Sequence, residues 1–367
     1  MGHFCLFMTT MSGDSRCVCC SLQRNRVVMT LLGHNDVVTS VAWVSDVESE
    51  SKEHCLVSGS ADGGIIFWKV QLDLDQNRTC PWEMVQRFDG HHRGPVTCVA
   101  VDVPSSVVVT TGGDGCVTII SSRDWEYCQE QRLSFGTKLV HCAAITRVNQ
   151  GSKLLAMGFV DGTVQVFASS GDAICFSLAC NLSGHQNWIR GIDFAHIEGD
   201  RILLATGSQD RYVRVWSIDK TQPDRSVSLD SLGITKYAPK PRIYVGDESY
   251  DIILESLLVG HEDWVMSVAW NTTKVVPLAD LTLLSSSMDR TMILWKRDIS
   301  SGMRTEIYNV HCSKHPTPFL YGMGCQKQCY INTYGIPDTL ARYNSLSCQD
   351  LSCRLIFQEY VHQAYYI

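Results

Sequence analysis

The chain has 367 residues, of which 45% are hydrophobic and 19% charged, and its formal net charge is −7. This composition is ordinary for a folded protein and argues against disorder. The negative charge gives no general attraction to nucleic acid or to an anionic membrane. No stretch reaches the roughly 18 to 20 uninterrupted apolar residues of a membrane-spanning helix. A signal peptide has Lys or Arg ahead of its apolar run, but neither residue precedes the short apolar run at this N-terminus. We therefore expect a cytoplasmic and nuclear protein without membrane contact.

The 17 cysteines favour a reducing compartment. Those between Cys55 and Cys180 mostly stand singly, several of them inside apolar runs such as VTCVAV and VHCAAI. Reduced, buried cysteine behaves in this way, as a small hydrophobic residue. A zinc site usually needs two Cys-x2-Cys pairs at a characteristic separation, and no second pair is found at that separation from a first. The sequence therefore predicts no metal site.

Residues 1 to 24 are rich in cysteine and carry no repeat, and we expect them to be irregular. From residue 25 to 303 one pattern recurs. A full unit combines a Gly-His pair, an alternating strand, a second strand that runs into a turn with an aspartate, and a third strand with an apolar residue six positions after that aspartate. The units lie near residues 33–70, 90–122, 136–168, 184–218 and 260–297.

The units agree position by position. Gly-His opens the first, second, fourth and fifth units, whereas the third begins near Phe135-Gly136 without it. Strands such as VVTSVAWV and WVMSVAW alternate in polarity, and each leads on to a turn of the SADGG kind. Strand-rich units of about 40 to 45 residues with these marks are the signature of propeller blades. The predicted fold is therefore an all-β WD40 β-propeller, with five recognisable blades of an expected seven and an incomplete ring.

Four of the five units are predicted to hold a structural network of His, Ser or Thr and Asp, with Trp as a further member in three of them. WD repeats use these residues as one hydrogen-bonded set, and a buried aspartate is stable only when its acceptors are filled. Because the set recurs once per blade, we interpret it as structural and not as a catalytic triad. We predict no catalytic and no cofactor-binding residue. The predicted set comprises His34, Ser58, Asp62, Trp68, His91, Thr110, Asp114, His185, Thr206, Asp210, Trp216, His261, Ser285, Asp289 and Trp295.

Two units depart from the pattern. Ile120 replaces Trp in the second unit. The third unit has Met157 in place of Ser or Thr and lacks the histidine, which leaves Asp161 without its expected partners. We therefore expect the loss of Asp62 or Asp210 to destabilise the protein more than the loss of Asp161.

A pair of tryptophans is a candidate for a binding surface. Trp188 and Trp264 each follow Gly-His by three positions, on the loop before the first strand of the unit. In one interpretation they pack between neighbouring blades. In the other they join Arg190, Gln209 and Met288 as partner-facing anchors, because Trp and Arg dominate interface hot spots.

Two stretches lie outside the pattern. Residues 217–256 mix Asp, Lys, Pro and Ser without clean periodicity, and we interpret them as an insertion that leaves the propeller rim. Residues 304–367 carry no Gly-His, no aspartate turn and no alternating run. We expect a poorly ordered tail there, and a truncated chain whose ring is left with open edges.

Four stretches resemble the family of the WD-repeat second subunit of the Elongator complex. They are GHQNWIRGIDF (184–194), TGSQDRYVRVW (206–216), GHEDWVMSVAW (260–270) and LLSSSMDRTMILW (283–295). A long insertion separates the second stretch from the third, as in that family, and Ser-Phe-Gly at 134–136 is similar to it as well. The resemblance covers about residues 26 to 303, and members of the family have two propellers in a longer chain.

The resemblance implies a non-catalytic scaffold that holds the largest and the catalytic subunits of Elongator together. That complex modifies the wobble uridine of certain transfer RNAs and is associated with the regulation of translation and of transcription elongation. Contact of this subunit with transfer RNA is expected to be indirect. Two other functions stay open. One is a different WD-repeat adaptor, such as a substrate receptor of a ubiquitin ligase, and the other is a propeller that binds RNA directly.

Overall fold

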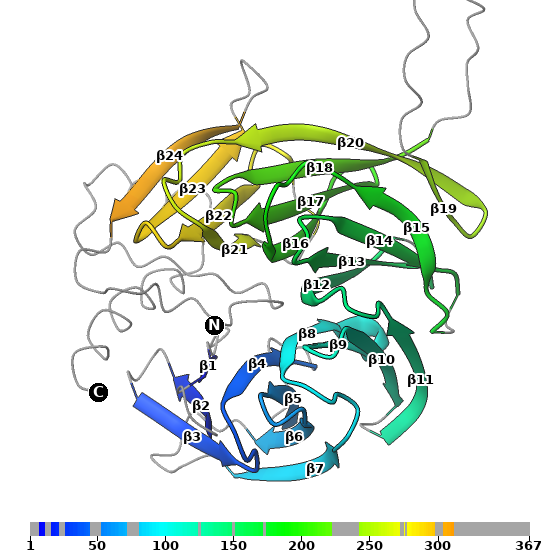
Figure 1. Ribbon diagram of the computed structural model, residues 1–367, viewed down its shortest axis with the longest axis vertical. Helices are drawn as coiled ribbons and strands as arrows, with labels where there is room; N and C mark the ends of the chain where they lie inside the picture. Colours follow the sequence, from blue (N-terminus) through cyan, green and yellow to red (C-terminus); the bar gives the residue numbers. More distant parts are fainter. Residues whose placement is uncertain are drawn as a thin grey trace, which may run out of the picture.

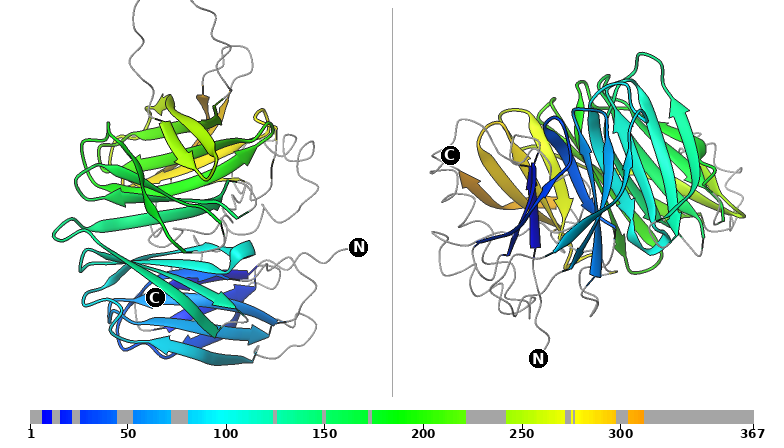
Figure 2. Two further views of the ribbon diagram at one scale, coloured as in Figure 1. Left: turned by 90° about the vertical axis from the view of Figure 1, so that its right-hand side faces the viewer. Right: turned by 90° about the horizontal axis from the view of Figure 1, so that it is seen from below.

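The computed structural model describes residues 7–11, 16–21, 26–44, 53–71, 81–123, 126–148, 151–171, 174–221, 242–271, 277–297 and 304–311, together with residue 275. Within these residues the regular structure is β-strand apart from one 3-10 turn at Val103–Ser105. Figure 1 shows the strands gathered into sheets that stand side by side in a curved array. Seen from the side, the sheets form successive layers (Figure 2).

The described strands form six antiparallel sheets. The N-terminal sheet has the strands β1 (Phe7–Met11), β2 (Arg16–Ser21) and β3 (Arg26–Leu32). Blade 1 has β4 (Val38–Trp43), β5 (Glu53–Ser60), β6 (Ile65–Gln71) and β7 (Trp82–Phe88). Blade 2 has β8 (Val96–Asp102), β9 (Val107–Gly112), β10 (Cys116–Arg123) and β11 (Glu126–Ser134).

The next three blades repeat this plan. Blade 3 has β12 (Val140–Arg147), β13 (Lys153–Phe159), β14 (Val164–Ser169) and β15 (Ser177–Leu182). Blade 4 has β16 (Ile189–Ile197), β17 (Arg201–Ser208), β18 (Val213–Lys220), β19 (Arg242–Val245) and β20 (Glu248–Leu258). Blade 5 has β21 (Val265–Trp270), β22 (Thr282–Ser287), β23 (Thr291–Arg297) and β24 (Arg304–His311).

Each blade places its first strand toward the middle of the array. Contacts between neighbouring blades join β4 to β8, β8 to β12, β12 to β16 and β16 to β21. Figure 1 shows these strands in the middle and β7, β11 and β20 on the outside. Neighbours in the sequence are therefore neighbours in space, which is the arrangement of a β-propeller.

The described strands do not close the ring. The N-terminal sheet contacts blade 1, through β1 and β4. None of its strands packs closely against a strand of blade 5 within the described residues, and Figure 1 shows these two sheets at the two ends of the array. The predicted fold class, an incomplete all-β propeller, is confirmed.

Several strands lie where the sequence predicted none. Residues 1–24 were expected to be irregular but contain β1 and β2, and β24 begins at residue 304, in the expected tail. The rest of that tail, residues 312–367, lies outside the described residues. Every blade also has an outer strand that carries none of the marks of the repeat. These strands face solvent on one side, as the mostly exposed β7 does, and so they need fewer apolar residues.

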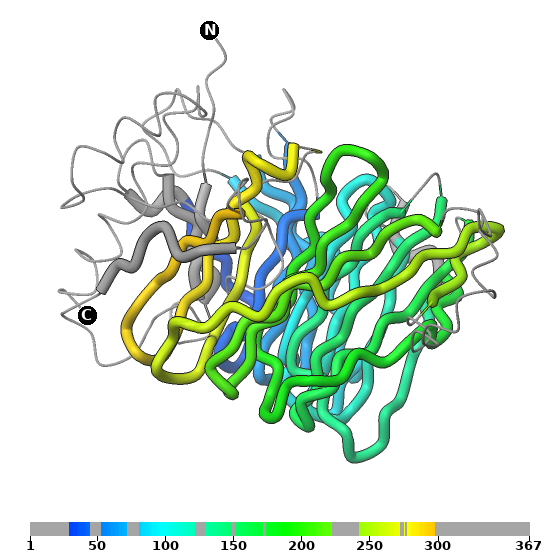
Figure 3. The backbone as a smooth tube through the Cα atoms, turned by 90° about the horizontal axis from the view of Figure 1, so that it is seen from above, coloured from blue at the N-terminus to red at the C-terminus, as the bar shows by residue number. Residues whose placement is uncertain are grey.

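The described part of the expected insertion at residues 217–256 belongs to blade 4. The third strand β18 extends to Lys220, and β20 is the fourth strand of the sheet. Strand β19 pairs with β20 as an additional outer strand, and we call this hairpin (residues 242–258) the strap. Residues 222–241 lie outside the described residues. In Figure 3 the turn of the strap, in yellow-green, lies at the right-hand side, and β20 runs from it across the front of the view.

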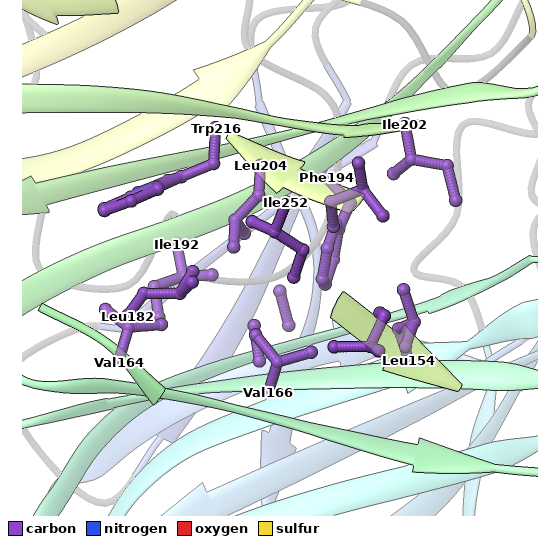
Figure 4. Close-up of a cluster of buried hydrophobic side chains, with 14 of the residues drawn as sticks. Leu154, Val164, Val166, Leu182, Ile192, Phe194, Ile202, Leu204, Trp216 and Ile252 are labelled. Carbon is purple, nitrogen blue, oxygen red and sulfur yellow. The ribbon is translucent and has the colours of Figure 1, made fainter. Parts of the chain in front are cut away.

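The strap joins blade 4 to blade 3. Strand β19 contacts β14 and β15 of blade 3, and the backbone N–H of Gly246 donates to Ser170 Oγ at 2.9 Å. Ile243 and Val245 are fully buried, whereas Tyr244 between them is 69% exposed, as the alternation of a strand requires. Both buried residues belong to the core shared by the two blades, part of which is shown in Figure 4. Burial of two such side chains stabilises the fold by about 3 to 5 kcal/mol.

Buried cysteines add small apolar side chains to the blade cores. Cys55, Cys98 and Cys142 are buried thiols, as their apolar surroundings in the sequence indicate. Burial raises the pKa of Cys55 to about 12 and that of Cys142 well above its ordinary value. Both therefore remain neutral thiols at physiological pH.

Candidate functional site

A chain of hydrogen bonds crosses blade 4 from its third strand to its aspartate turn. Trp216 Nε1 donates to Thr206 Oγ1 at 3.3 Å, and Thr206 Oγ1 lies 2.9 Å from His185 Nε2. His185 Nδ1 lies 2.8 Å from Asp210 Oδ2, which also accepts the backbone N–H of Gln186 at 3.1 Å. The carboxylate of Asp210 is thus buried with its acceptors filled, which makes its burial tolerable.

Blade 5 holds the same network. His261 Nε2 lies 2.8 Å from Ser285 Oγ, and His261 Nδ1 lies 3.0 Å from Asp289 Oδ2. Trp295 Nε1 donates to Ser285 Oγ at 2.8 Å. Thr291 adds a further donor to the carboxylate, through its hydroxyl at 2.6 Å.

Blade 1 holds a looser version. His34 Nε2 and Trp68 Nε1 both lie 2.8 Å from Ser58 Oγ, but His34 Nδ1 lies 3.4 Å from Asp62 Oδ2. The Asp62 carboxylate accepts the backbone N–H of Asn35 at 2.8 Å instead. Backbone donors therefore carry more of the stabilisation of this aspartate than the histidine does.

The histidine in the network of blade 2 is His92, so the prediction that His91 belongs to this network is wrong. His92 Nε2 lies 2.9 Å from Thr110 Oγ1, and His92 Nδ1 lies 3.3 Å from Asp114 Oδ1. His91 lies outside the network, with its Nε2 3.3 Å from Glu130 Oε2. Sequence reasoning followed the Gly-His pair, although two histidines stand in succession at this point.

Spacing to the inner strand identifies the correct histidine. In every network the histidine lies four residues before the first residue of the inner strand, which fixes how far the ring reaches back over the sheet. The pairs are His34 and Val38, His92 and Val96, His185 and Ile189, and His261 and Val265.

Blade 3 replaces the polar network by aromatic packing. Gly136 stands where the other blades have histidine, and Met157, which is fully buried, stands where they have Ser or Thr. Phe135 packs edge-to-face on Phe159 and Phe167, with ring centroids 5.1 and 6.0 Å apart. An apolar core of similar volume can replace a buried polar network without loss of stability. Blade 3 is therefore stabilised by apolar packing where the other blades use hydrogen bonds.

Asp161 of blade 3 is correspondingly different from the other turn aspartates. Its carboxylate accepts the backbone N–H of Thr163 at 3.0 Å and pairs with Lys138 Nζ at 3.0 Å. The side chain is 36% exposed, against 6% for Asp210. Solvent can therefore replace the lost bonds of Asp161 but not those of Asp210.

The protonation states in the networks follow from burial. Desolvation lowers the pKa of His34 and of His92 despite the nearby carboxylates, so both imidazoles are neutral at physiological pH. Burial alone would raise the pKa of Asp210, but the hydrogen bonds and charge interaction with His185 and the backbone donors hold it below its ordinary value. In blades 1 and 2 a neutral imidazole thus lies beside an ionised carboxylate, Asp62 or Asp114, whose own pKa is held below its ordinary value by backbone donors and by the histidine, and this arrangement fits a structural role.

One face of the array carries both sets of loops that the networks tie together: the loop before each inner strand and the turn between the second and third strands. We call it the top face. In blade 4 the backbone N–H of Gln209, in the turn, donates to the carbonyl of Trp188, in the loop, at 2.9 Å. In blade 5 Met288 and Trp264 make the same bond at 2.9 Å. The predicted partner-facing residues thus come from equivalent positions of two adjacent blades.

Trp188 anchors a cluster at the inner edge of the top face of blade 4. Its indole is 40% exposed, and the guanidinium carbon of Arg190 lies 4.8 Å from the ring centroid, which is a cation–π contact. Arg190 Nη1 donates to His141 Nε2 of blade 3 at 2.9 Å. With its amide oxygen facing Arg190, Gln209 accepts from Nε at 2.8 Å and from Nη2 at 2.5 Å. The cluster holds the guanidinium in a fixed position beside the exposed indole.

The predicted partner-facing residues do not all face outward. Trp264 is 42% exposed, so both tryptophans present a large aromatic surface to solvent. Met288 is half-buried, and Gln209 is only 7% exposed. Gln209 therefore positions Arg190 and does not itself offer a contact surface. Sequence reasoning missed His141, whose signal is its place in strand β12, equivalent to that of Arg190 in β16.

The turns of blades 4 and 5 contain strained arginines. Arg211 and Arg290 follow the network aspartates and have φ angles of 77° and 67°. The equivalent residues of the other blades are glycines, with φ between 70° and 83° (Gly63, Gly115 and Gly162). A residue with a Cβ in this left-handed region costs about 1 kcal/mol or more relative to glycine. Both arginines are exposed on the top face.

The cluster predicts a dependence of stability on pH. Burial and the charge of Arg190 lower the pKa of His141 to about 4 from its ordinary 6.5. Between these values the unfolded chain binds a proton that the folded chain does not. The stability from this group is therefore present above pH 6.5 and is lost as the pH falls toward 4, by about 3 kcal/mol.

Urea unfolding at several pH values measures this dependence. We expect His141→Gln, which keeps an acceptor for Arg190 but does not titrate, to have a smaller loss of stability between pH 6.5 and 4.5 than the unmodified chain. Part of the loss will persist, because the pKa values of His34 and His92 are lowered as well. An unchanged slope in the variant would show that His141 is not buried as a neutral group.

Two further kinds of site, a metal centre and a membrane span, are absent from the described part of the chain. No three His, Cys, Asp or Glu side chains there are placed to hold a metal ion. In the same residues no helix has the length and apolar character needed to cross a membrane. The exposed tryptophans and the guanidinium held beside Trp188 make the top face of blades 4 and 5 the candidate functional site.

Comparison with known proteins agrees with the repeat. The sequence model described as "WD domain, G-beta repeat" matches residues 25–69, 82–121, 176–217 and 253–296. Each match begins with an outer strand and continues through the first three strands of the following blade. Blade 3 has no match of its own beyond its outer strand, in keeping with its loss of His, Ser or Thr and Trp.

Three proteins that are similar to this chain all have the name Elongator complex protein 2. The chain is 34% identical to Elongator complex protein 2 of Danio rerio over 301 residues, which is 78% of the chain. It is 30% identical to that of Homo sapiens over 300 residues and 28% identical to that of Arabidopsis thaliana over 332 residues, or 77% and 81% of the chain. The chain spans only 34% to 38% of the length of these relatives.

Proposed function

Because the chain is a WD-repeat protein that resembles Elongator complex protein 2 over 78% of its length, we propose that it is a non-catalytic scaffold subunit of an Elongator complex. In this role it holds the largest and the catalytic subunits and so supports the modification of wobble uridines in transfer RNA. The transfer RNA is contacted through those subunits. We further propose that the protein acts in the cytoplasm and the nucleus.

The observation that carries the proposal is the similarity to proteins of this name over 77% to 81% of the chain. The top face adds support, because exposed Trp beside a fixed Arg is typical of the centre of protein interfaces. The recurrence of His, Ser or Thr and Asp in four blades is explained by blade structure. No reaction needs to be assumed to account for these residues.

Reconstitution tests the proposal. The tagged 367-residue chain is co-expressed with the largest and the catalytic Elongator subunits and captured through its tag. We expect both subunits to be retained. We expect the double variant Trp188→Ala/Trp264→Ala to retain at least tenfold less, because hot-spot tryptophans carry much of the binding energy.

An exposed tryptophan elsewhere provides the matched control. Trp82 lies on the outer strand β7 and is 38% exposed, so Trp82→Ala removes a similar indole away from the top face. We expect its capture to match that of the unmodified chain. Capture of neither subunit would refute the Elongator role, and an equal effect of Trp82→Ala would refute the role of the top face.

A further inference from the structure

Blades 4 and 5 carry the same pair of residues on the top face, and the other blades do not. Each has an exposed Trp directly before its inner strand and an exposed Arg directly after its network aspartate (Trp188, Arg211, Trp264 and Arg290). The other blades have Val, Pro or Leu in the first position and glycine in the second (Val37, Pro95, Leu139, Gly63, Gly115 and Gly162). Since strands β16 and β21 are in contact, the two pairs lie on neighbouring blades.

The fold gives no internal reason for the two arginines. Within the described residues neither Arg211 nor Arg290 makes a side-chain ion pair or hydrogen bond, although other arginines of the blades do. Their left-handed backbone is one that glycine adopts without strain. Residues with a strained backbone cluster at active sites and at positions that hold a ligand.

The charges around the pairs favour a ligand with carboxylates. The nearest aspartates, Asp210 and Asp289, are turned inward to their histidines and are only 6% and 7% exposed. Arg190 adds a third positive charge beside Trp188. On blade 5 the exposed Glu262 and Asp263 offset part of the positive charge near Trp264, so the positive region is centred on blade 4.

We propose that the top face of blades 4 and 5 binds an extended acidic segment of a partner protein. Its apolar side chains pack on the indoles of Trp188 and Trp264, and its carboxylates pair with Arg211 and Arg290. A guanidinium binds a carboxylate through two parallel hydrogen bonds, and exposed indoles bury large apolar areas. A peptide suits this surface better than RNA. RNA carries a negative charge at every nucleotide, which Glu262, Asp263 and the net charge of −7 oppose, whereas a peptide can place its carboxylates beside the arginines alone.

This inference deepens the proposed scaffold role by naming the chemistry of one bound segment, and its test needs no Elongator subunit. Random 12-residue peptides displayed on phage are selected on the immobilised 367-residue chain. Selected peptides are then synthesised, and their affinities are measured by fluorescence anisotropy. A 12-nucleotide oligouridine serves as the RNA probe. Failure of reconstitution with Elongator subunits and failure of peptide binding are thus separate results.

We expect the selected peptides to combine Asp or Glu with large apolar residues. Arg211→Gly and Arg290→Gly should each weaken their binding at least fivefold and raise the melting temperature by about 2 °C, because the strain is relieved. A residue needed only for structure would lower the melting temperature when replaced. The opposite signs of the two effects therefore separate a binding role from a structural one.

Lys220→Ala is the matched control, since Lys220 ends the same strand, β18, that begins just after Arg211. We expect it to leave peptide binding unchanged. The proposal is overturned if the selected peptides are basic or uncharged, if only oligouridine binds, or if the glycine variants bind the peptides as tightly as the unmodified chain does. It is also overturned if both glycine variants melt at lower temperature.

Discussion

We expect Asp210→Ala to lower the free energy of unfolding by about 3 kcal/mol. The substitution leaves the buried Nδ1 of His185 and the backbone N–H groups of Gln186 and Tyr212 without the carboxylate that accepts them. Solvent cannot reach the gap readily, because the side chain of Asp210 is only 6% exposed. Urea unfolding followed by circular dichroism measures the loss.

The matched substitution is Asp161→Ala in blade 3. Its carboxylate is partly exposed and its ion pair is with Lys138, which is 55% exposed, so we expect a loss below about 1 kcal/mol. Asp62→Ala should fall between the two, because its histidine is 3.4 Å away and its backbone donors dominate. Equal losses in all three variants would contradict the assignment of the networks.

A second large effect is expected from the strap. We expect Ile243→Ala to lower the free energy of unfolding by about 2 to 4 kcal/mol, because Ile243 is fully buried in the core shared by blades 3 and 4. The local loss of stability should be largest in blade 3, because this blade lacks a polar network and is contacted by β19. Hydrogen exchange of β14 and β15 reports this local loosening alongside global unfolding.

Tyr244 provides the control for the strap. It lies on the same strand with its side chain 69% exposed, so Tyr244→Ala should change stability by no more than about 0.5 kcal/mol. If Ile243→Ala were as mild as Tyr244→Ala, the strap would be an appendage of blade 4 and not a clamp between the blades.

The sequence predicted the parts of the fold that depend on residues with special chemistry. Gly-His, the turn aspartate and the tryptophan recur because a hydrogen-bonded network requires each at a fixed place, and so they mark the first three strands of a blade. Outer strands have no such requirement. Strand β24 was therefore assigned to a tail, and β20 to an insertion, although both complete their sheets.

The candidate site was predicted less completely, for reasons of register and burial. His91 and His92 differ by one position, and only the distance to Val96 distinguishes them. Gln209 has the polarity of a contact residue, yet it is buried against Arg190. The contact between His141 and Arg190 joins blades 3 and 4 across 49 residues of sequence. Such a contact follows from how the blades meet, which the repeat alone does not reveal.

The central claim is that this chain is a scaffold whose top face on blades 4 and 5 contacts another protein. Hydrogen exchange of the reconstituted complex with the largest and catalytic Elongator subunits tests it most directly. We expect slower exchange in residues 184–190, 209–212, 260–266 and 288–291 than in the free chain, and unchanged exchange in residues 198–201 and 245–248 at the opposite ends of the strands. Protection confined to those opposite ends, or a stable complex without any protection of the top face, would contradict the account.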